Sequence, residues 1–214
     1  MNGDGAPVGS GAIVEVGAGR RLAVDTTGAP GGRPVLYLHG TPDSRLSRHP
    51  DGDAAARLGV EVLAVDRPGI GRSDPDPGRG LASVADDLAT VLATTMAGPA
   101  GVVAWSAGAP YAVALAVRHA ESVGHVVLVA PAVPITAYAN PAVLDAGGPG
   151  RALFAEMASE LPADEVASEV APYMLPDPAT PESVAALLDA EADPGRAADL
   201  AAAGLDPDHL VRAT

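Results

Sequence analysis

Residues 102–108 read Val-Val-Ala-Trp-Ser-Ala-Gly, and they are the most informative residues about the fold. An apolar run typical of a strand buried on both faces of a parallel sheet leads directly into Ser106. Ala104 and Gly108, two positions away on either side, are small enough for the serine to occupy a tight turn. The helix that follows would direct its free N–H groups at Ser106, where they favour developing negative charge. The pattern indicates a nucleophilic serine, although a serine that only caps the helix remains an alternative.

Strands and helices alternate on both sides of this stretch. Apolar runs predict strands, and apolar residues at helical spacing predict the helices between them. The expected strands are 35–38, 60–65, 101–105 and 125–129. One expected helix ends at Leu58, a second begins at its cap Ser83, and a third spans 107–119. Residues 33–130 thus predict a parallel, doubly wound α/β sheet with helices on both faces, because crossovers are right-handed. Residues 12–16 and 21–25 predict an N-terminal hairpin.

The sequence divides into three parts. Residues 1–10 are rich in glycine and small side chains and predict a flexible N-terminus. Residues 11–133 predict the α/β core. After Pro131 the strand-like runs stop, and alanine-rich amphipathic patterns separated by proline and glycine predict a helical cap over residues 134–214.

Composition excludes several classes of function. The 214 residues contain no cysteine, which excludes disulfides, thiol catalysis and thiolate metal sites. The net charge of −14 argues against nucleic acid or an anionic membrane as a partner. No basic leader or apolar run of membrane-spanning length is present, so we expect a cytoplasmic protein. No metal or cofactor is expected.

Two further motifs follow expected strands. His39-Gly40-Thr41-Pro42 comes after the first parallel strand, and Asp66-Arg67-Pro68-Gly69-Ile70-Gly71-Arg72-Ser73 comes after the second. Parallel strands place their carboxyl ends at one edge of the sheet, where ligands bind in open α/β folds. Together with the strand-to-serine turn, these motifs resemble the α/β-hydrolase superfamily from the first hairpin to Pro131. Ala104 departs from the glycine usual at its position in that family.

The resemblance implies a role for each motif. The backbone N–H groups of Thr41 and Ala107 would form the oxyanion hole, since Pro42 has no N–H. His39 would brace its loop together with Gly40; a role for His39 as general base is the alternative. Asp66, Gly69 and Gly71 would shape a supporting loop, with both glycines at positive φ. A phosphate-binding interpretation of these glycines conflicts with the absence of a Gly-Lys-Ser/Thr continuation.

The remainder of a catalytic triad has no clear place in this sequence. In the family, an acid and then a histidine follow the cap on two further strands. No such strands are predicted before Thr214, so we expect a C-terminally incomplete chain in which residues 126–129 form an exposed apolar sheet edge. His209 and Asp145 are the nearest alternatives for base and acid, but both roles stay unassigned.

The resemblance implies a serine hydrolase of the esterase, lipase or aminopeptidase kind, acting on an ester, amide or related acyl bond of a small molecule. The 214-residue chain alone would be inactive. Acyl transfer and lyase chemistry are alternatives in the same pocket, and a non-catalytic binding module is an alternative of a different class. Tyr138, Phe154 and Tyr173 are candidates for an apolar acyl pocket, or for packing.

Overall fold

The computed structural model describes residues 11–48 and 52–132, together with the isolated positions 156, 157, 160–162, 165, 166, 168, 180 and 182. The flexible N-terminus expected for residues 1–10 and the cap expected for residues 134–214 therefore lie almost wholly outside the described residues. The same holds for Tyr138, Phe154 and Tyr173.

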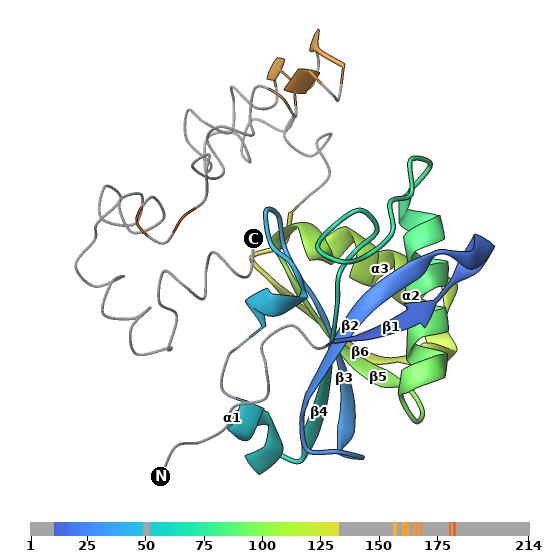
Figure 1. Ribbon diagram of the computed structural model, residues 1–214, viewed down its shortest axis with the longest axis vertical. Coiled ribbons are helices and arrows are strands. Elements are labelled where there is room, and N and C mark those ends of the chain that lie inside the picture. Colours follow the sequence, from blue (N-terminus) through green and yellow to red (C-terminus); the bar gives the residue numbers. More distant parts are fainter. Residues whose placement is uncertain are drawn as a thin grey trace.

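The described core is a six-stranded sheet with helices on both faces (Figure 1). The elements are β1 (Ala12–Glu15), β2 (Arg21–Gly28), β3 (Arg33–Leu38), α1 (Gly52–Arg57), β4 (Val60–Val65), α2 (Leu81–Thr95), β5 (Ala100–Trp105), α3 (Ala109–Arg118) and β6 (Val123–Val129). The strand order is β1-β2-β4-β3-β5-β6. Strands β1 and β2 form an antiparallel hairpin, and β2 pairs antiparallel with β4. The strands β3 to β6 run parallel to one another, as expected.

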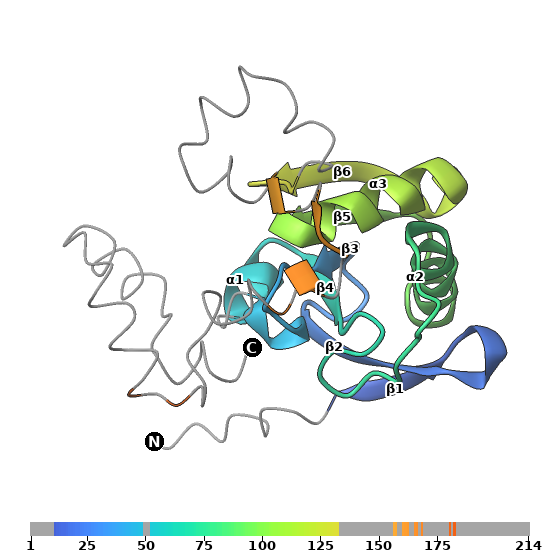
Figure 2. The ribbon, with the colours of Figure 1, turned by 90° about the horizontal axis from the view of Figure 1, so that it is seen from above.

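The main core lies between the sheet and the pair α2 and α3, and α1 packs on the opposite face (Figure 2). Successive strand residues alternate between these faces. Leu36 and Leu38 are completely buried beneath α2 and α3. Tyr37 instead lines an apolar cavity of about 460 Å³ beside α1. Each fully buried leucine or valine contributes roughly 1.5–3 kcal/mol to stability, so the α2/α3 face carries most of the hydrophobic stabilisation.

Register brings the three motifs to one edge of the sheet. Leu38, the last residue of β3, pairs with Val65 at the end of β4 and with Ala104 near the end of β5. The segments that follow these strands begin at His39, Asp66 and Ser106. Because all three strands run in the same direction, these segments emerge side by side.

Two helix starts differ from the sequence prediction. Ser83 is not the cap of α2, which begins at Leu81; its hydroxyl accepts from the Gly80 N–H at 3.0 Å from inside the first turn. Regular helix α3 begins at Ala109 rather than at Ala107, because a 3₁₀ turn at Ser106–Gly108 precedes it.

Strand β6 lies at one edge of the described sheet and is exposed. Val126, Val127 and Leu128 are 36%, 53% and 40% exposed, and these alternating side chains point to both faces. The expected apolar edge is therefore present within the described range. Among the described residues, no helix is both long enough and apolar enough to cross a bilayer.

Candidate active site

Ser106 occupies the turn that connects β5 to α3. Its φ is +45°, a left-handed conformation that costs energy for a residue with a side chain and that clusters at functional sites. The turn is pressed against β3. A Cβ placed on Gly108 would lie 2.5 Å from the Leu38 carbonyl oxygen and 2.8 Å from that of His39. Only glycine fits this approach, so the small residue expected after the serine has a direct steric reason.

The loop that follows β3 lies beside the serine. A Cβ placed on Gly40 would lie 3.3 Å from the Ser106 Cβ and 2.7 Å from Cδ1 of Trp105. Thr41, the next residue, is exposed. The structure therefore brings the proposed donor segment and Ser106 together, with the Ala107 backbone in the 3₁₀ turn next to them.

His39 is held inside this loop by both of its ring nitrogens. It is completely buried, its Nε2 accepts from the Arg67 backbone N–H at 3.2 Å, and its Nδ1 lies 2.8 Å from the Gly40 carbonyl oxygen. An Nε2 that accepts requires the proton on Nδ1, which then donates to Gly40. Burial, reinforced by the nearby Arg67 charge, lowers the pKa of His39 from 6.5 to about 4. These bonds support a bracing role and disfavour a role as general base.

The lowered pKa of His39 predicts that the folded protein loses stability in acid. The unfolded chain binds a proton at His39 below pH 6.5, whereas the folded chain binds it only below about pH 4. His39 therefore contributes stability above pH 6.5, and that contribution is lost as the pH falls to about 4, amounting to about 3 kcal/mol.

The measurement is urea unfolding from pH 4 to 7.5 for the native protein and for His39→Gln, whose amide oxygen can still accept from Arg67. We expect a shallower pH dependence in the variant between pH 4 and 6.5, and parallel curves above pH 6.5. Curves that run parallel over the whole range would contradict the neutral, buried histidine.

Asp66 anchors the supporting loop after β4 from within the core. Its carboxylate accepts from the Arg45 guanidinium at 2.6 Å, from the Arg45 N–H at 2.7 Å and from the Arg72 N–H at 3.0 Å. Both Asp66 and Arg45 are almost completely buried. Gly71, at φ +55°, is so close to this carboxylate that a Cβ there would collide with it. Gly69 also has the expected positive φ, of +78°.

Three residues near Ser106 were not expected from the sequence. Arg67 and Tyr111 meet across the loops, with the guanidinium carbon 5.1 Å from the ring centroid. Asp43 is half-buried, which raises its pKa, and a hydrogen bond with the Gly40 backbone opposes that shift. Arg67 follows Asp66 within the loop motif, but nothing in the spacing shows where its side chain reaches.

The histidines in the described ranges either lie far from Ser106 or already form hydrogen bonds with other groups. His119 lies at the C-terminal end of α3, about 15 Å along the helix from its start, with Nε2 2.7 Å from Oδ1 of Asp86. His125 pairs with Gly101 at the opposite end of β5, about 16 Å from the serine. His49, His209 and Asp145 lie outside the described residues.

Comparison with known proteins agrees with this architecture. The chain is 37% identical over 121 residues to a 2-hydroxy-6-oxononadienedioate/2-hydroxy-6-oxononatrienedioate hydrolase of Burkholderia vietnamiensis, a match covering 54% of this chain and 42% of that protein. The matched part thus spans less than half of that relative.

Solved structures with the same fold include enzymes of several kinds. An epoxide hydrolase of Vigna radiata is 24% identical with a TM-score of 0.50, over 55% of this chain and 37% of that one. An esterase of Exiguobacterium antarcticum is 22% identical with a TM-score of 0.51, over 56% and 45%. The thioesterase domain of the curacin biosynthetic pathway is 23% identical with a TM-score of 0.51, over 65% and 54%.

The family itself is identified over most of the chain. A family model described as the alpha/beta hydrolase fold matches residues 33–170. That range includes the sheet from β3 onward and all three motifs. The chain therefore belongs to the alpha/beta hydrolase fold family.

Proposed function

We propose that the protein is a serine hydrolase of small acyl compounds with Ser106 as its nucleophile. The observation that carries this proposal is the positive φ of Ser106 on a strand-to-helix turn, with Gly40 so near that a Cβ placed on it would lie 3.3 Å from the Ser106 Cβ. A serine at the start of a helix has no need of such a conformation to act as a cap. We infer that the conformation directs Oγ to the edge of the sheet, as a nucleophile elbow requires.

The reaction proceeds through an acyl-enzyme. Ser106 Oγ bonds to the carbonyl carbon of the substrate as its proton passes to a base, and the carbonyl oxygen becomes an oxyanion. The backbone N–H groups of Thr41 and Ala107 donate to this oxyanion. Collapse expels the leaving group, which takes up the proton. Water then adds to the acyl carbon and releases the acid, which restores the serine hydroxyl.

We propose that the base for this reaction comes from outside the described residues. His39 is fixed by two hydrogen bonds. His119 lies at the far end of α3, and His125 lies in β6 beside Gly101, at the far end of β5. The Burkholderia relative is named as a hydrolase of 2-hydroxy-6-oxononadienedioate and 2-hydroxy-6-oxononatrienedioate, both of which carry an oxo group. This name supports attack at a carbonyl carbon as the common step.

Stopped-flow kinetics of the complete gene product with p-nitrophenyl acetate and butyrate test this mechanism. We expect a burst of p-nitrophenolate approaching one equivalent per protein, or steady turnover through an acyl-enzyme detectable by mass spectrometry after acid quench. Turnover that leaves no acyl group on the protein under quench, with either ester, would contradict the covalent route.

A non-catalytic binding module is the second candidate. The absence of a suitably placed histidine among residues 11–48 and 52–132 favours it. The test is whether the complete, cooperatively folded gene product binds arylboronic acids or esters. Binding without acylation of the protein and without ester turnover would favour this candidate.

A further inference from the structure

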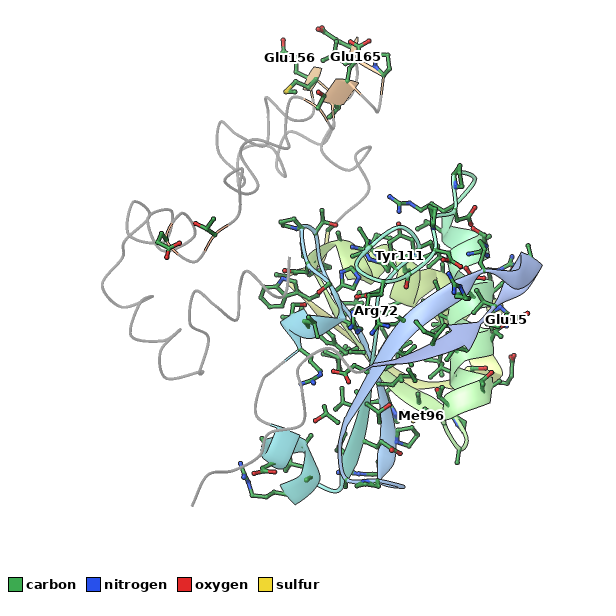
Figure 3. The ribbon with its side chains drawn as sticks, viewed as in Figure 1. Glu15, Arg72, Met96, Tyr111, Glu156 and Glu165 are labelled. Atoms are coloured by element: carbon green, nitrogen blue, oxygen red, sulfur yellow. The ribbon has the colours of Figure 1, made fainter. Side chains whose placement is uncertain are left out.

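Arg67 connects three elements around the candidate site. Its side chain extends from the loop after β4 and is only 8% exposed. Its Nη2 donates to the Gly40 carbonyl oxygen at 2.5 Å and to Thr41 Oγ1 at 3.0 Å, both in the loop after β3. Its guanidinium lies over the ring of Tyr111, which projects from α3 toward these loops (Figure 3). One buried cation therefore joins β4, β3 and α3 where Ser106 emerges.

The bond to Gly40 fixes an entire peptide unit. The Gly40 carbonyl and the Thr41 N–H belong to the same planar amide, and in a trans peptide they point in opposite directions. Among the described residues, only the Thr41-Pro42 bond is cis, so the Gly40–Thr41 bond is trans. A donor that holds the carbonyl in place consequently holds the N–H in the opposite direction. Arg67 and His39 both contact this carbonyl, at 2.5 and 2.8 Å.

The same bond strengthens the amide as a donor. Hydrogen bonds to an amide oxygen polarise the amide, so its N–H becomes a better donor to an anion, and a charged partner increases the effect. The hydrogen bonds from Arg67 to the loop after β3 go to a neutral carbonyl and a neutral hydroxyl. Burial disfavours the charged guanidinium, and the neighbouring Asp43 and Tyr111 offset this only in part, since the pKa of Arg67 is lowered overall.

We propose that Arg67 is a positioning residue for the oxyanion hole: it orients and polarises the Gly40–Thr41 peptide so that the Thr41 N–H meets the oxyanion formed at Ser106. This inference rests on the proposed function. Arg67 acts through the peptide and does not itself contact the reacting atoms.

The role is tested with Arg67→Met, Arg67→Lys and the matched control Arg79→Met in the complete gene product. Arg79 donates to the Pro68 carbonyl of the same loop and makes no contact with the Gly40–Thr41 peptide in the described structure. We expect Arg67→Met to lower kcat about 10- to 100-fold with KM within threefold, because the donor acts mainly in the transition state. The kcat of Arg67→Lys should be at least fivefold higher than that of Arg67→Met, and the kcat of Arg79→Met should stay within twofold of the native value.

A second readout separates positioning from folding. The affinity of an arylboronic acid, which forms a tetrahedral anion on the serine, should fall by the same factor as kcat/KM, while affinity for an unreactive amide analogue is unchanged. Should Arg67→Met fail to fold, Arg67→Lys is compared with the native protein, and we expect a smaller decrease in its kcat, about 2- to 20-fold, with KM within threefold. Native kcat and boronate affinity in a folded Arg67 variant would overturn the proposal, as would a loss confined to KM. Activity that survives Ser106→Ala would instead show that the proposed function itself has failed.

Discussion

Ser106→Ala is expected to lower kcat/KM of the complete gene product for an activated ester by about 10⁴-fold or more, with little change in stability. Without Oγ no acyl-enzyme can form, and water must attack the substrate directly. The side chain is only partly buried, so removing its oxygen leaves no cavity of consequence in the core. The measurement is steady-state kinetics with p-nitrophenyl butyrate, together with thermal unfolding of the same samples.

Ser83→Ala is the matched control for this variant. Ser83 lies in the first turn of α2, is half-buried like Ser106, and bonds only to the Gly80 backbone among the described contacts. We expect native kcat/KM for it. A Ser106→Ala protein that keeps more than a tenth of the native kcat/KM would exclude Ser106 as the nucleophile.

Asp66→Ala is expected to destabilise the protein by roughly 3–5 kcal/mol at pH 7. The substitution leaves the Arg45 guanidinium, 3% exposed, without the carboxylate 2.6 Å away that compensates its charge. It also removes the acceptor for the backbone N–H groups of Arg45 and Arg72. Urea unfolding measures the loss, and the supporting loop should become susceptible to proteolysis in the same variant.

Asp74→Ala provides the comparison within the same loop. Asp74 also forms a bidentate pair, with Arg21, but that arginine is 64% exposed and water solvates it once the partner is removed. We expect a much smaller loss of stability. Similar losses in both variants would contradict the distinction between the buried and the exposed ion pair.

The fold could be predicted from the sequence because its signals are local and repeated. The stretch Val60–Val65, which is apolar except for Glu61, matches β4 residue for residue, because Gly59 and Asp66 mark its two limits in the sequence. Helix starts were less accurate. Ser83 has the chemistry of a cap but bonds the helix from its first turn, and the 3₁₀ turn at Ser106–Gly108 delays α3 because the serine adopts a positive φ.

The site could be predicted only as far as strand order determines it. Sequence motifs at the ends of β3, β4 and β5 place Gly40, Asp66 and Ser106 at one edge, and the register confirms this placement. The bridge from Arg67 to Gly40 spans 27 positions and depends on how far one long side chain extends. The periodicity of apolar residues in the sequence does not predict such a contact, and it does not predict the Asp66–Arg45 pair either.

Fluorophosphonate labelling of the complete gene product, followed by peptide mapping, tests the central assignment most directly. The reagent bonds to a serine Oγ that is activated and supported by an oxyanion hole. The expected result is a single adduct on the peptide containing Ser106, absent from Ser106→Ala and from heat-unfolded protein. An unmodified Ser106 in folded protein, or an adduct on a different serine, would contradict the assignment of Ser106 as the nucleophile.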